Sequence, residues 1–389
     1  MKKKVAVLGA AGSIGKSTID VLRSAIDDFE PVLFTTHTNA DALAALANEF
    51  PSALIALSSE SESNSASENS SANSALKNIS RNKIFFGKDG LLNAIKNCGA
   101  DIVLHGIAGS AGLDVTLAVL ESGADLALAN KETVVMAWDL VKNMADLNKC
   151  KIIPVDSEHS AVFSLINAHC ESHLELDEII LTASGGPFRN VKDLNCVTVE
   201  DALAHPTWNM GAKITIDSAS LANKGLEVIE AVRLFNMPCE KVSVVIHPQS
   251  IVHSMIRKTD GTVYAEMSNP DMRLPIHKAL YFPLVKPCPF ARLDFNAPLS
   301  LSFDAPDFER FPMLRLAYES VKAGAAYTIA YNAANEVAVA AFIAKKITFP
   351  KIPHITSSVL DRISAAPPIV IGDIYEIDKK ARSLANELF

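Results

Sequence analysis

The chain has 389 residues, of which 49% are hydrophobic and 21% are charged, and its formal net charge is −8 at pH 7. Such a chain can bury a full core, and its length predicts two or three domains. The acidic balance, with no run of Lys or Arg longer than Lys2 to Lys4, argues against nucleic acid as a partner.

The cysteines and the hydropathy predict a cytoplasmic protein without a membrane segment. Six cysteines are scattered singly, without the paired spacing of zinc sites or redox motifs, so we expect core residues in a reducing compartment. Three N-terminal lysines followed by an apolar run mimic a signal peptide, but Gly9, Gly12 and Gly15 interrupt that run. No uninterrupted apolar stretch approaches the roughly 20 residues of a membrane helix.

The first third of the chain alternates short apolar runs with segments of helical spacing. Strands are predicted at 4–8, 32–35, 101–104 and 125–129, and helices at 17–24, 41–49 and 113–122. This alternation predicts an α/β protein with an N-terminal, Rossmann-like parallel sheet. The segment 58–80 is rich in Ser, Asn and Glu and is predicted to be a solvated insertion.

The rest of the chain changes character twice. Residues 151–265 mix strands and helices and hold most polar motifs, which predicts a central α/β catalytic domain. Seven prolines between Pro275 and Pro312 predict an extended connector. Helices are predicted at 313–323, 333–345 and 374–388, forming a small C-terminal α-helical domain.

A glycine turn follows the first predicted strand. Gly9, Gly12 and Gly15 recur at every third residue and open a helix, where free backbone N–H groups bind a pyrophosphate. A triphosphate-binding P-loop is the rival interpretation, but it requires glycine where this chain has Ala10. No carboxylate ends the second strand, so the sequence favours NADPH over NADH.

Acidic side chains predict a site for a hard metal ion. Asp156 and Glu158 follow an apolar strand, and residues two apart on an extended chain project the same way. Oxygen ligands without nearby Cys favour Mg²⁺ or Mn²⁺ over zinc. Glu227, after Asn223 and Lys224, is the candidate third ligand. The alternative is that all three are surface charges.

Polar loops predict a phosphorylated substrate. Ser184-Gly185-Gly186 offers a hydroxyl and flexible N–H groups, and Ser218 and Lys224 add donors. The segment 205–210 is polar and contains Trp208, one of two tryptophans. It is either a mobile lid over a ligand or a loop anchored on the core.

Several strings resemble the motifs of 1-deoxy-D-xylulose-5-phosphate reductoisomerases, in the same order along essentially the whole chain. They are Leu-Gly-Ala-Ala-Gly-Ser-Ile-Gly (8–15), Ala-Asn-Lys-Glu (129–132), Pro-Val-Asp-Ser-Glu-His (154–159), Ser-Gly-Gly-Pro-Phe (184–188), His-Pro-Thr-Trp-Asn-Met (205–210), Asn-Lys-Gly-Leu-Glu (223–227), His-Pro-Gln-Ser (247–250) and Asn-Ala-Ala-Asn-Glu (332–336).

The resemblance implies an NADPH-dependent rearrangement and reduction of 1-deoxy-D-xylulose 5-phosphate to 2-C-methyl-D-erythritol 4-phosphate in the non-mevalonate isoprenoid pathway. The metal, Mg²⁺ or Mn²⁺ with Co²⁺ as a further option, would act as Lewis acid on either a retro-aldol or a ketol-shift path. Family members are typically homodimers inhibited by fosmidomycin.

The resemblance also implies roles for individual residues. The catalytic set would be Lys131, Asp156, Glu158 and Glu227, the last three as metal ligands. Substrate would be bound by Ser157, Ser184, His205, Trp208, Met210, Ser218, Asn223 and Lys224. The cofactor would be bound by Ala11, Gly12, Ser13, Ile14, His37, Thr38, Asn39, Asn130, Glu132 and Gly211.

Together the patterns predict four segments: an NADPH-binding domain at 1–150, a metal- and substrate-binding domain at 151–280, a linker at 281–305 and a helical domain at 306–389. Two departures from the family are visible, namely no basic residue near Thr38 and the insertion at 58–80. The competing functions are a reductase of another phosphorylated sugar or ketone and a non-catalytic dinucleotide sensor.

Overall fold

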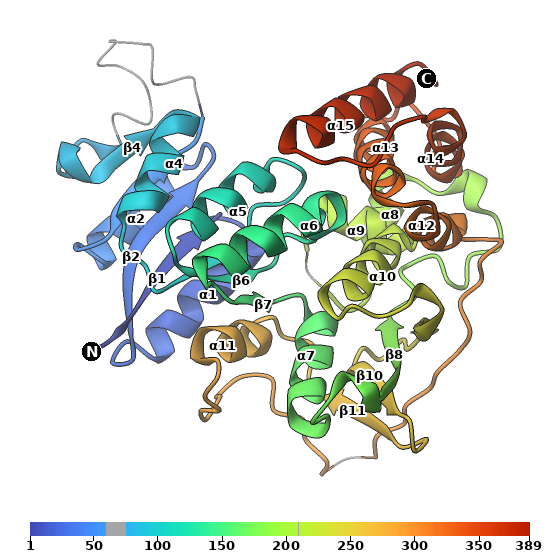
Figure 1. Cartoon of the computed structure of the whole chain (residues 1–389), viewed down its shortest axis with the longest axis horizontal. Coiled ribbons are helices and arrows are strands. Elements are labelled where there is room, and N and C mark those ends of the chain that lie inside the picture. Colours follow the sequence, from blue (N-terminus) through green and yellow to red (C-terminus); the bar gives the residue numbers. More distant parts are fainter. Residues whose placement is uncertain (60–74, 209, 297) are drawn as a thin grey trace. The chain divides into compact units, whose positions relative to one another are not determined.

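The computed structural model describes residues 1–59, 75–208, 210–296 and 298–389, so residues 60–74 of the predicted insertion lie outside the described part. The chain forms two compact units, each built from separated segments (Figure 1). The first unit contains residues 1–130, 141–156 and 272–290, and the second contains 131–140, 157–271 and 291–389. The four-part division of the sequence stays a prediction.

A seven-stranded parallel sheet forms the centre of the first unit, with strand order β4-β3-β2-β1-β5-β6-β7. The strands are β1 (Lys3–Leu8), β2 (Phe29–Thr36), β3 (Leu54–Leu57), β4 (Ile84–Phe86), β5 (Ile102–His105), β6 (Asp125–Leu128) and β7 (Ile152–Pro154). Every residue of β5 is buried, as expected where both faces of a parallel sheet are covered. The predicted Rossmann-like sheet is confirmed.

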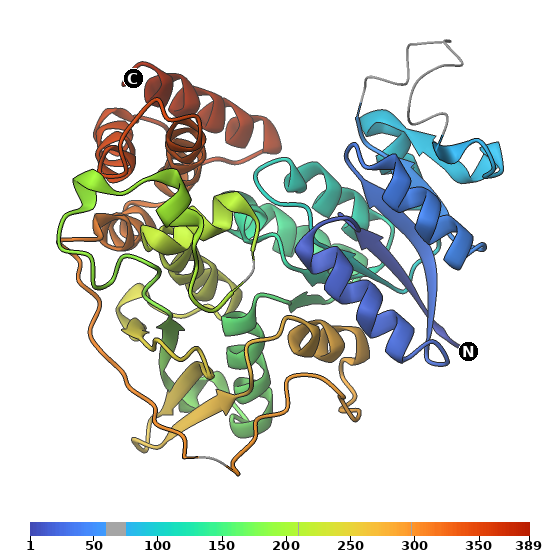
Figure 2. The ribbon, with the colours of Figure 1, turned by 180° about the vertical axis from the view of Figure 1, so that it is seen from behind.

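Helices connect these strands. They are α1 (Ser13–Ser24), α2 (Ala40–Glu49), α4 (Gly87–Asn97), α5 (Gly112–Glu121) and the second half of α6 (Lys131–Asn148), whose backbone is non-helical at Ala137. A further helix, α11 (Arg273–Tyr281), packs on α1, and Figure 2 shows it in gold beside the blue α1.

The predicted extended connector is wrong at both ends. Pro275 lies in α11 and Pro312 begins α12, so neither proline is in irregular chain. Both occupy the first turn of their helix, where a missing N–H removes no bond within the helix. Proline therefore marks helix starts here.

The second unit combines a four-stranded mixed sheet with helices. The sheet order is β11-β10-β8-β9, from β8 (Leu176–Ala183), β9 (Val242–Ile246), β10 (Val252–Lys258) and β11 (Val263–Met267). The helices are α7 (Ser157–His169), α8 (Val199–Leu203), α9 (Ala212–Ala219), α10 (Ala222–Leu234), α12 (Pro312–Ala323), α13 (Ala325–Ile343), α14 (Lys351–Arg362) and α15 (Ile371–Asn386).

The C-terminal helices share one core with this sheet and with α10. Figures 1 and 2 show α12 to α15 gathered together. The fully buried Tyr331 of α13 donates a hydrogen bond to the carbonyl of Met313, 3.1 Å away. A Cβ on Gly225 of α10 would lie 2.5 Å from the Tyr331 hydroxyl, so glycine is needed for α13 to approach α10. The C-terminal helices are confirmed, but α13 begins eight residues before its predicted start and α14 was not predicted.

The cysteines only partly follow the prediction. All six are free thiols. Only Cys239 is buried and Cys196 is exposed, so the expected core placement is wrong for most of them.

Among the described residues, none of the helices has the length and apolar character needed to cross a bilayer.

Candidate active site

Asp156 and Glu158 lie at the junction between β7 and α7. The expected extended Asp-x-Glu is wrong, because α7 begins at Ser157 and places Glu158 in its first turn. The apolar strand ends at Pro154, and the buried Ala161, Val162 and Leu165 continue with helical spacing. The turn into the helix therefore orients both carboxylates, and the Ser157 hydroxyl donates to Glu158 Oε2 at 2.6 Å.

The start of α10 supplies the third carboxylate. Glu227 lies four residues after Asn223 and three after Lys224, so both of these side chains can reach it on the helix surface. One carboxylate oxygen each of Asp156, Glu158 and Glu227 lies within 4.8 Å of the others. This all-oxygen donor set suits Mg²⁺ or Mn²⁺.

Two buried lysines offset the negative charge of these acids. Lys131 Nζ lies 3.0 Å from Glu227 Oε1 and 2.9 Å from Asn223 Oδ1. Lys224 Nζ lies 2.9 Å from Glu158 Oε1 and also donates to Glu227 Oε2. Burial alone would lower the pKa of Lys224, but Glu158 and Glu227 outweigh it and raise that pKa. Two ammonium groups against three carboxylates leave the group net negative, which fits a divalent cation.

His159 and Glu230 support this cluster, and neither was predicted as a site residue. His159 Nε2 lies 2.9 Å from the backbone oxygen of Glu227, and its Nδ1 lies 3.2 Å from Glu230 Oε2. Both side chains are almost fully buried. These contacts connect α7 to α10. They hold the first turn of α7, which carries Glu158, against the turn of α10 that carries Glu227. The only available signal was that His159 directly follows Glu158.

Ser184, His205 and Ser218 form a second polar group. His205 Nε2 lies 3.0 Å from Ser184 Oγ and 3.2 Å from Ser218 Oγ. Its Nδ1 accepts from the backbone N–H groups of Thr207 and Trp208, at 3.1 and 2.9 Å, so the ring is neutral with its proton on Nε2. Burial lowers the pKa of His205, in agreement with this state.

Close backbone contact at Gly186 holds this group together. Gly185 and Gly186 follow β8 with φ of +81° and +66°, a region that glycine enters without strain. A Cβ on Gly186 would lie 2.7 Å from the backbone oxygen of Ser218. The predicted Ser-Gly-Gly turn is therefore also the place where the end of α9 approaches.

Asn223 and Lys224, which were predicted to bind the substrate with Ser184 and Ser218, donate hydrogen bonds to the carboxylates of Glu227 and Glu158.

The segment 205–210, for which a lid and an anchored loop were both predicted as alternatives, connects α8 to α9. Trp208 is half-buried, and its ring centroid lies 6.4 Å from that of His253. Met210 is also half-buried, and Asn209 between them lies outside the described residues. Gly211 is the N-cap of α9 and provides no side-chain cap.

The glycine turn in the first unit leads into α1, and the start of this helix has no side-chain cap. Gly9 has φ +81°, and its N–H donates to Thr35 Oγ1 at 3.1 Å. A Cβ on Gly15 would lie 2.3 Å from the Gly9 oxygen, so only glycine allows α1 to pack here. Gly12 caps α1 without a side-chain hydrogen bond, which leaves its first N–H groups for an anion. Ala11, Ser13 and Ile14 surround this point.

Other predicted cofactor residues have defined local contacts. Asn39 Oδ1 accepts from Ala42 N at 2.9 Å and caps α2, while His37 Nδ1 lies 3.0 Å from Ser58 Oγ. Asn130 donates to the carbonyls of Ile107 and Gly109 after β5. Thr38 is exposed at the end of β2. In the second unit, Glu132 is buried and paired with Lys213.

Three family models match this chain. They are the 1-deoxy-D-xylulose 5-phosphate reductoisomerase model at residues 5–138, its C-terminal domain at 152–235 and the DXP reductoisomerase C-terminal domain at 267–384. Curated 1-deoxy-D-xylulose 5-phosphate reductoisomerases include that of Treponema denticola, 45% identical over 99% of this chain and 96% of the relative. That of Chlorobium chlorochromatii is 43% identical over 99% of each.

Solved structures agree with the sequence relatives. The Zymomonas mobilis reductoisomerase in complex with NADPH has a TM-score of 0.90 and 40% identity, covering 100% of this chain and 99% of its own. A DOX-P reductoisomerase in complex with NADPH, fosmidomycin and magnesium has a TM-score of 0.89 and 36% identity, covering 99% and 98%. Because these matches extend over the whole length and not over one domain, the chain belongs to the 1-deoxy-D-xylulose 5-phosphate reductoisomerase family.

Proposed function

We propose that this protein converts 1-deoxy-D-xylulose 5-phosphate to 2-C-methyl-D-erythritol 4-phosphate, with NADPH as reductant and a divalent cation as cofactor. The observation that carries the proposal is the carboxylate cluster of Asp156, Glu158 and Glu227 beside Lys131, in a chain of this family. A dinucleotide sensor has no need of three acids and two lysines in one buried and half-buried group.

Asp156, Glu158 and Glu227 would hold Mg²⁺ or Mn²⁺. When bound there, the ion supplies Lewis acidity and a template for the neighbouring oxygens of a hydroxyketone. Hydrogen bonds from Ser157 and Lys224 keep the Glu158 carboxylate in place. Those from Asn223 and Lys131 do the same for Glu227.

Lys131 would stabilise negative charge on the reacting oxygens. Its side chain is only 5% exposed, and at low local dielectric a buried cation acts more strongly than in water. The skeletal rearrangement, by either path, places transient charge on these oxygens. Lys131 therefore has the catalytic role, while Asn223 orients it.

Ser184, His205 and Ser218 would bind the phosphate of the substrate. The His205 Nε2–H and the two hydroxyls already converge, and each donates to an anion without a change of protonation. Asn223 and Lys224, at the start of the next helix, would extend this site from the metal side. Trp208 and Met210 would cover the bound sugar and exclude water.

NADPH would bind in the first unit with its pyrophosphate at the start of α1, near Ala11, Gly12, Ser13 and Ile14. It supplies the hydride for the reductive half of the reaction. His37, Thr38 and Asn39 present polar groups where NAD enzymes place a carboxylate, so the ribose 2′-phosphate meets no negative charge. Asn130, Glu132 and Gly211 would contact the remaining part of the cofactor.

Family resemblance supports three further assignments. We propose a homodimer, a cytoplasmic location, and activity with Mn²⁺ or Co²⁺ as well as Mg²⁺. No nucleic-acid or membrane partner is proposed for this acidic chain.

Oxidation of NADPH, followed by its absorbance, tests the activity. The purified protein should oxidise NADPH when 1-deoxy-D-xylulose 5-phosphate and Mn²⁺ are both present, and lose this activity in EDTA. Product analysis should identify the branched tetritol phosphate. Oxidation with another phosphorylated ketone and none with this substrate would indicate a different reductase, and NADPH binding without any turnover would indicate a sensor.

A further inference from the structure

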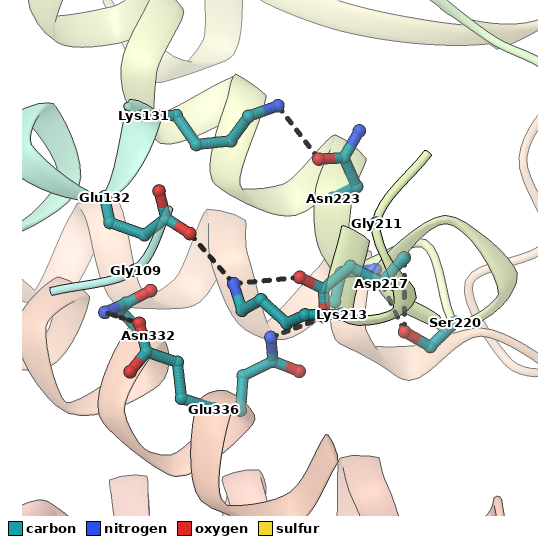
Figure 3. Close-up of polar contacts among 12 residues, drawn as sticks. Gly109, Lys131, Glu132, Gly211, Lys213, Asp217, Ser220, Asn223, Asn332 and Glu336 are labelled. Carbon is teal, nitrogen blue, oxygen red and sulfur yellow. Dashed lines mark hydrogen bonds and ion pairs between the residues drawn. The ribbon is translucent and has the colours of Figure 1, made fainter. Parts of the chain in front are cut away.

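A second ion-pair group in the second unit joins Lys213 to Glu132 and Asp217 (Figure 3). Lys213, in the first turn of α9, places its Nζ 3.0 Å from Glu132 Oε1 and 3.0 Å from Asp217 Oδ2. The other oxygen of Asp217 accepts from Asn335 of α13 at 2.8 Å. One ammonium thus joins α6 to α9, and Asp217 joins α9 to α13.

The positive charge of Lys213 balances the buried carboxylates of Glu132 and Asp217. The side chains of Glu132 and Asp217 are 7% and 1% exposed, whereas that of Lys213 is 25% exposed. Burial would lower the pKa of Lys213, but Asp217 and Glu132 outweigh it and raise that pKa. The lysine is therefore charged, and it neutralises two carboxylates that are otherwise costly to bury together.

Each partner of Lys213 is a direct neighbour of a site residue. Glu132 follows Lys131, and Asp217 precedes Ser218. Lys213 itself comes two residues after Gly211, which caps α9 without a side-chain hydrogen bond. The ion pairs therefore attach α9, which begins after Gly211 and carries Ser218, to the helix turn that carries Lys131.

We propose that Lys213 is a positioning residue, whose bridge between Glu132 and Asp217 sets the position of Ser218 relative to Lys131. This inference rests on the proposed function for the roles of Ser218 and Lys131. It assigns no contact between Lys213 and the substrate. Lys213 acts through the helix turns that it joins.

The bridge has a kinetic consequence that a purely structural ion pair lacks. Loss of the bridge removes the ion pair between α9 and Glu132 of α6 but keeps the hydrogen bond from Asn335 of α13 to Asp217. A displacement of about 1 Å between groups that bind a substrate costs up to ~10²-fold in rate. Lys213 pairs with Glu132 and Asp217, which are not among the three proposed metal ligands, so the affinity for Mn²⁺ should stay unchanged.

The test compares Lys213→Met, Lys213→Arg and, as the matched control, Lys345→Met in the purified full-length enzyme. Lys345 pairs with Glu200 at the surface, with both side chains 67% exposed. We expect Lys213→Met to lose roughly 10- to 100-fold in kcat/KM for the sugar phosphate, with KM raised and the Kd for Mn²⁺ unchanged. Lys213→Arg should restore most of the loss, and Lys345→Met should match wild type.

A double variant keeps the test valid if Lys213→Met does not fold. Lys213→Met with Asp217→Asn removes the cation together with one buried charge and keeps an acceptor for Asn335. The same loss in kcat/KM supports the proposal. A lower Tm with wild-type kcat/KM in either variant overturns it and makes the bridge structural. If wild-type enzyme itself fails to oxidise NADPH with the substrate, the proposed function fails and not this inference.

Discussion

Both carboxylate oxygens of Glu227 accept hydrogen bonds, from Lys131 and Asn223 at Oε1 and from Lys224 at Oε2. The side chain is 1% exposed, so this charge is held almost entirely by its neighbours. A buried carboxylate that is fully hydrogen-bonded has one orientation, which is what a metal ligand requires. Removing its charge should therefore affect chemistry more than folding.

Glu227→Gln tests this expectation. The amide keeps the shape but loses the charge that a cation needs, so turnover should fall by at least ~10²- to 10³-fold. NADPH affinity, measured by fluorescence titration, should stay unchanged because the glycine turn lies in the other unit. Glu240→Gln is the control, since Glu240 forms an exposed pair with Lys322. Wild-type turnover in Glu227→Gln would show that Glu227 is not a ligand.

His205 gives a second residue-scale prediction. Its pKa is lowered by burial from the ordinary value of 6.5, so the folded chain favours the neutral ring. The neutral ring should contribute stability above pH 6.5 that is lost as pH falls through the lowered value. At that point Nδ1 can no longer accept from Thr207 and Trp208. Ring resonances of His205 followed by NMR should titrate below 6.5, and titration above it would contradict the assignment.

At the scale of elements, glycines decide how α1 and α9 approach their neighbours. Gly15→Ala should lower NADPH affinity at least about tenfold and destabilise the protein, because the added Cβ would lie 2.3 Å from the Gly9 oxygen. Gly372→Ala is the matched control, because nothing lies within 4 Å of its Cβ. In α15 it should leave binding intact and stabilise by roughly 0.5–1 kcal/mol. Equal NADPH affinities in the two variants would contradict this account of the turn.

Helices and strands with a clear hydrophobic periodicity were predictable from the sequence. Elements that are buried on all sides by tertiary packing were not. The β1 and β2 strands and α1 and α2 helices follow local apolar spacing, and the structure confirms them within a few residues. The first half of α13 is buried all around, including Thr328, Tyr331 and Asn332, so no amphipathic period marks it. In α14, Pro353 interrupts the pattern near the helix start.

At the scale of the whole molecule, the chain crosses between its two units five times, at residues 130/131, 140/141, 156/157, 271/272 and 290/291. Asp156 and Lys131 each lie at such a crossing. Amino-acid composition and hydrophobic periodicity do not show where the chain passes from one unit to the other. The sequence therefore predicted a division into contiguous segments. Glu227 was a candidate third ligand because it follows Asn223 and Lys224, and the family resemblance implied its role beside residues seventy positions earlier. His159 was marked only by its place after Glu158, and Glu230 and Lys213 carried no local signal.

The central claim is that Asp156, Glu158 and Glu227 together bind one divalent cation. Anomalous diffraction from crystals soaked in MnCl₂ tests it most directly, because manganese is located without reference to any model of the site. The account predicts one strong anomalous peak in contact with all three carboxylates, absent from Glu227→Gln crystals. A peak elsewhere with none between these carboxylates would contradict it.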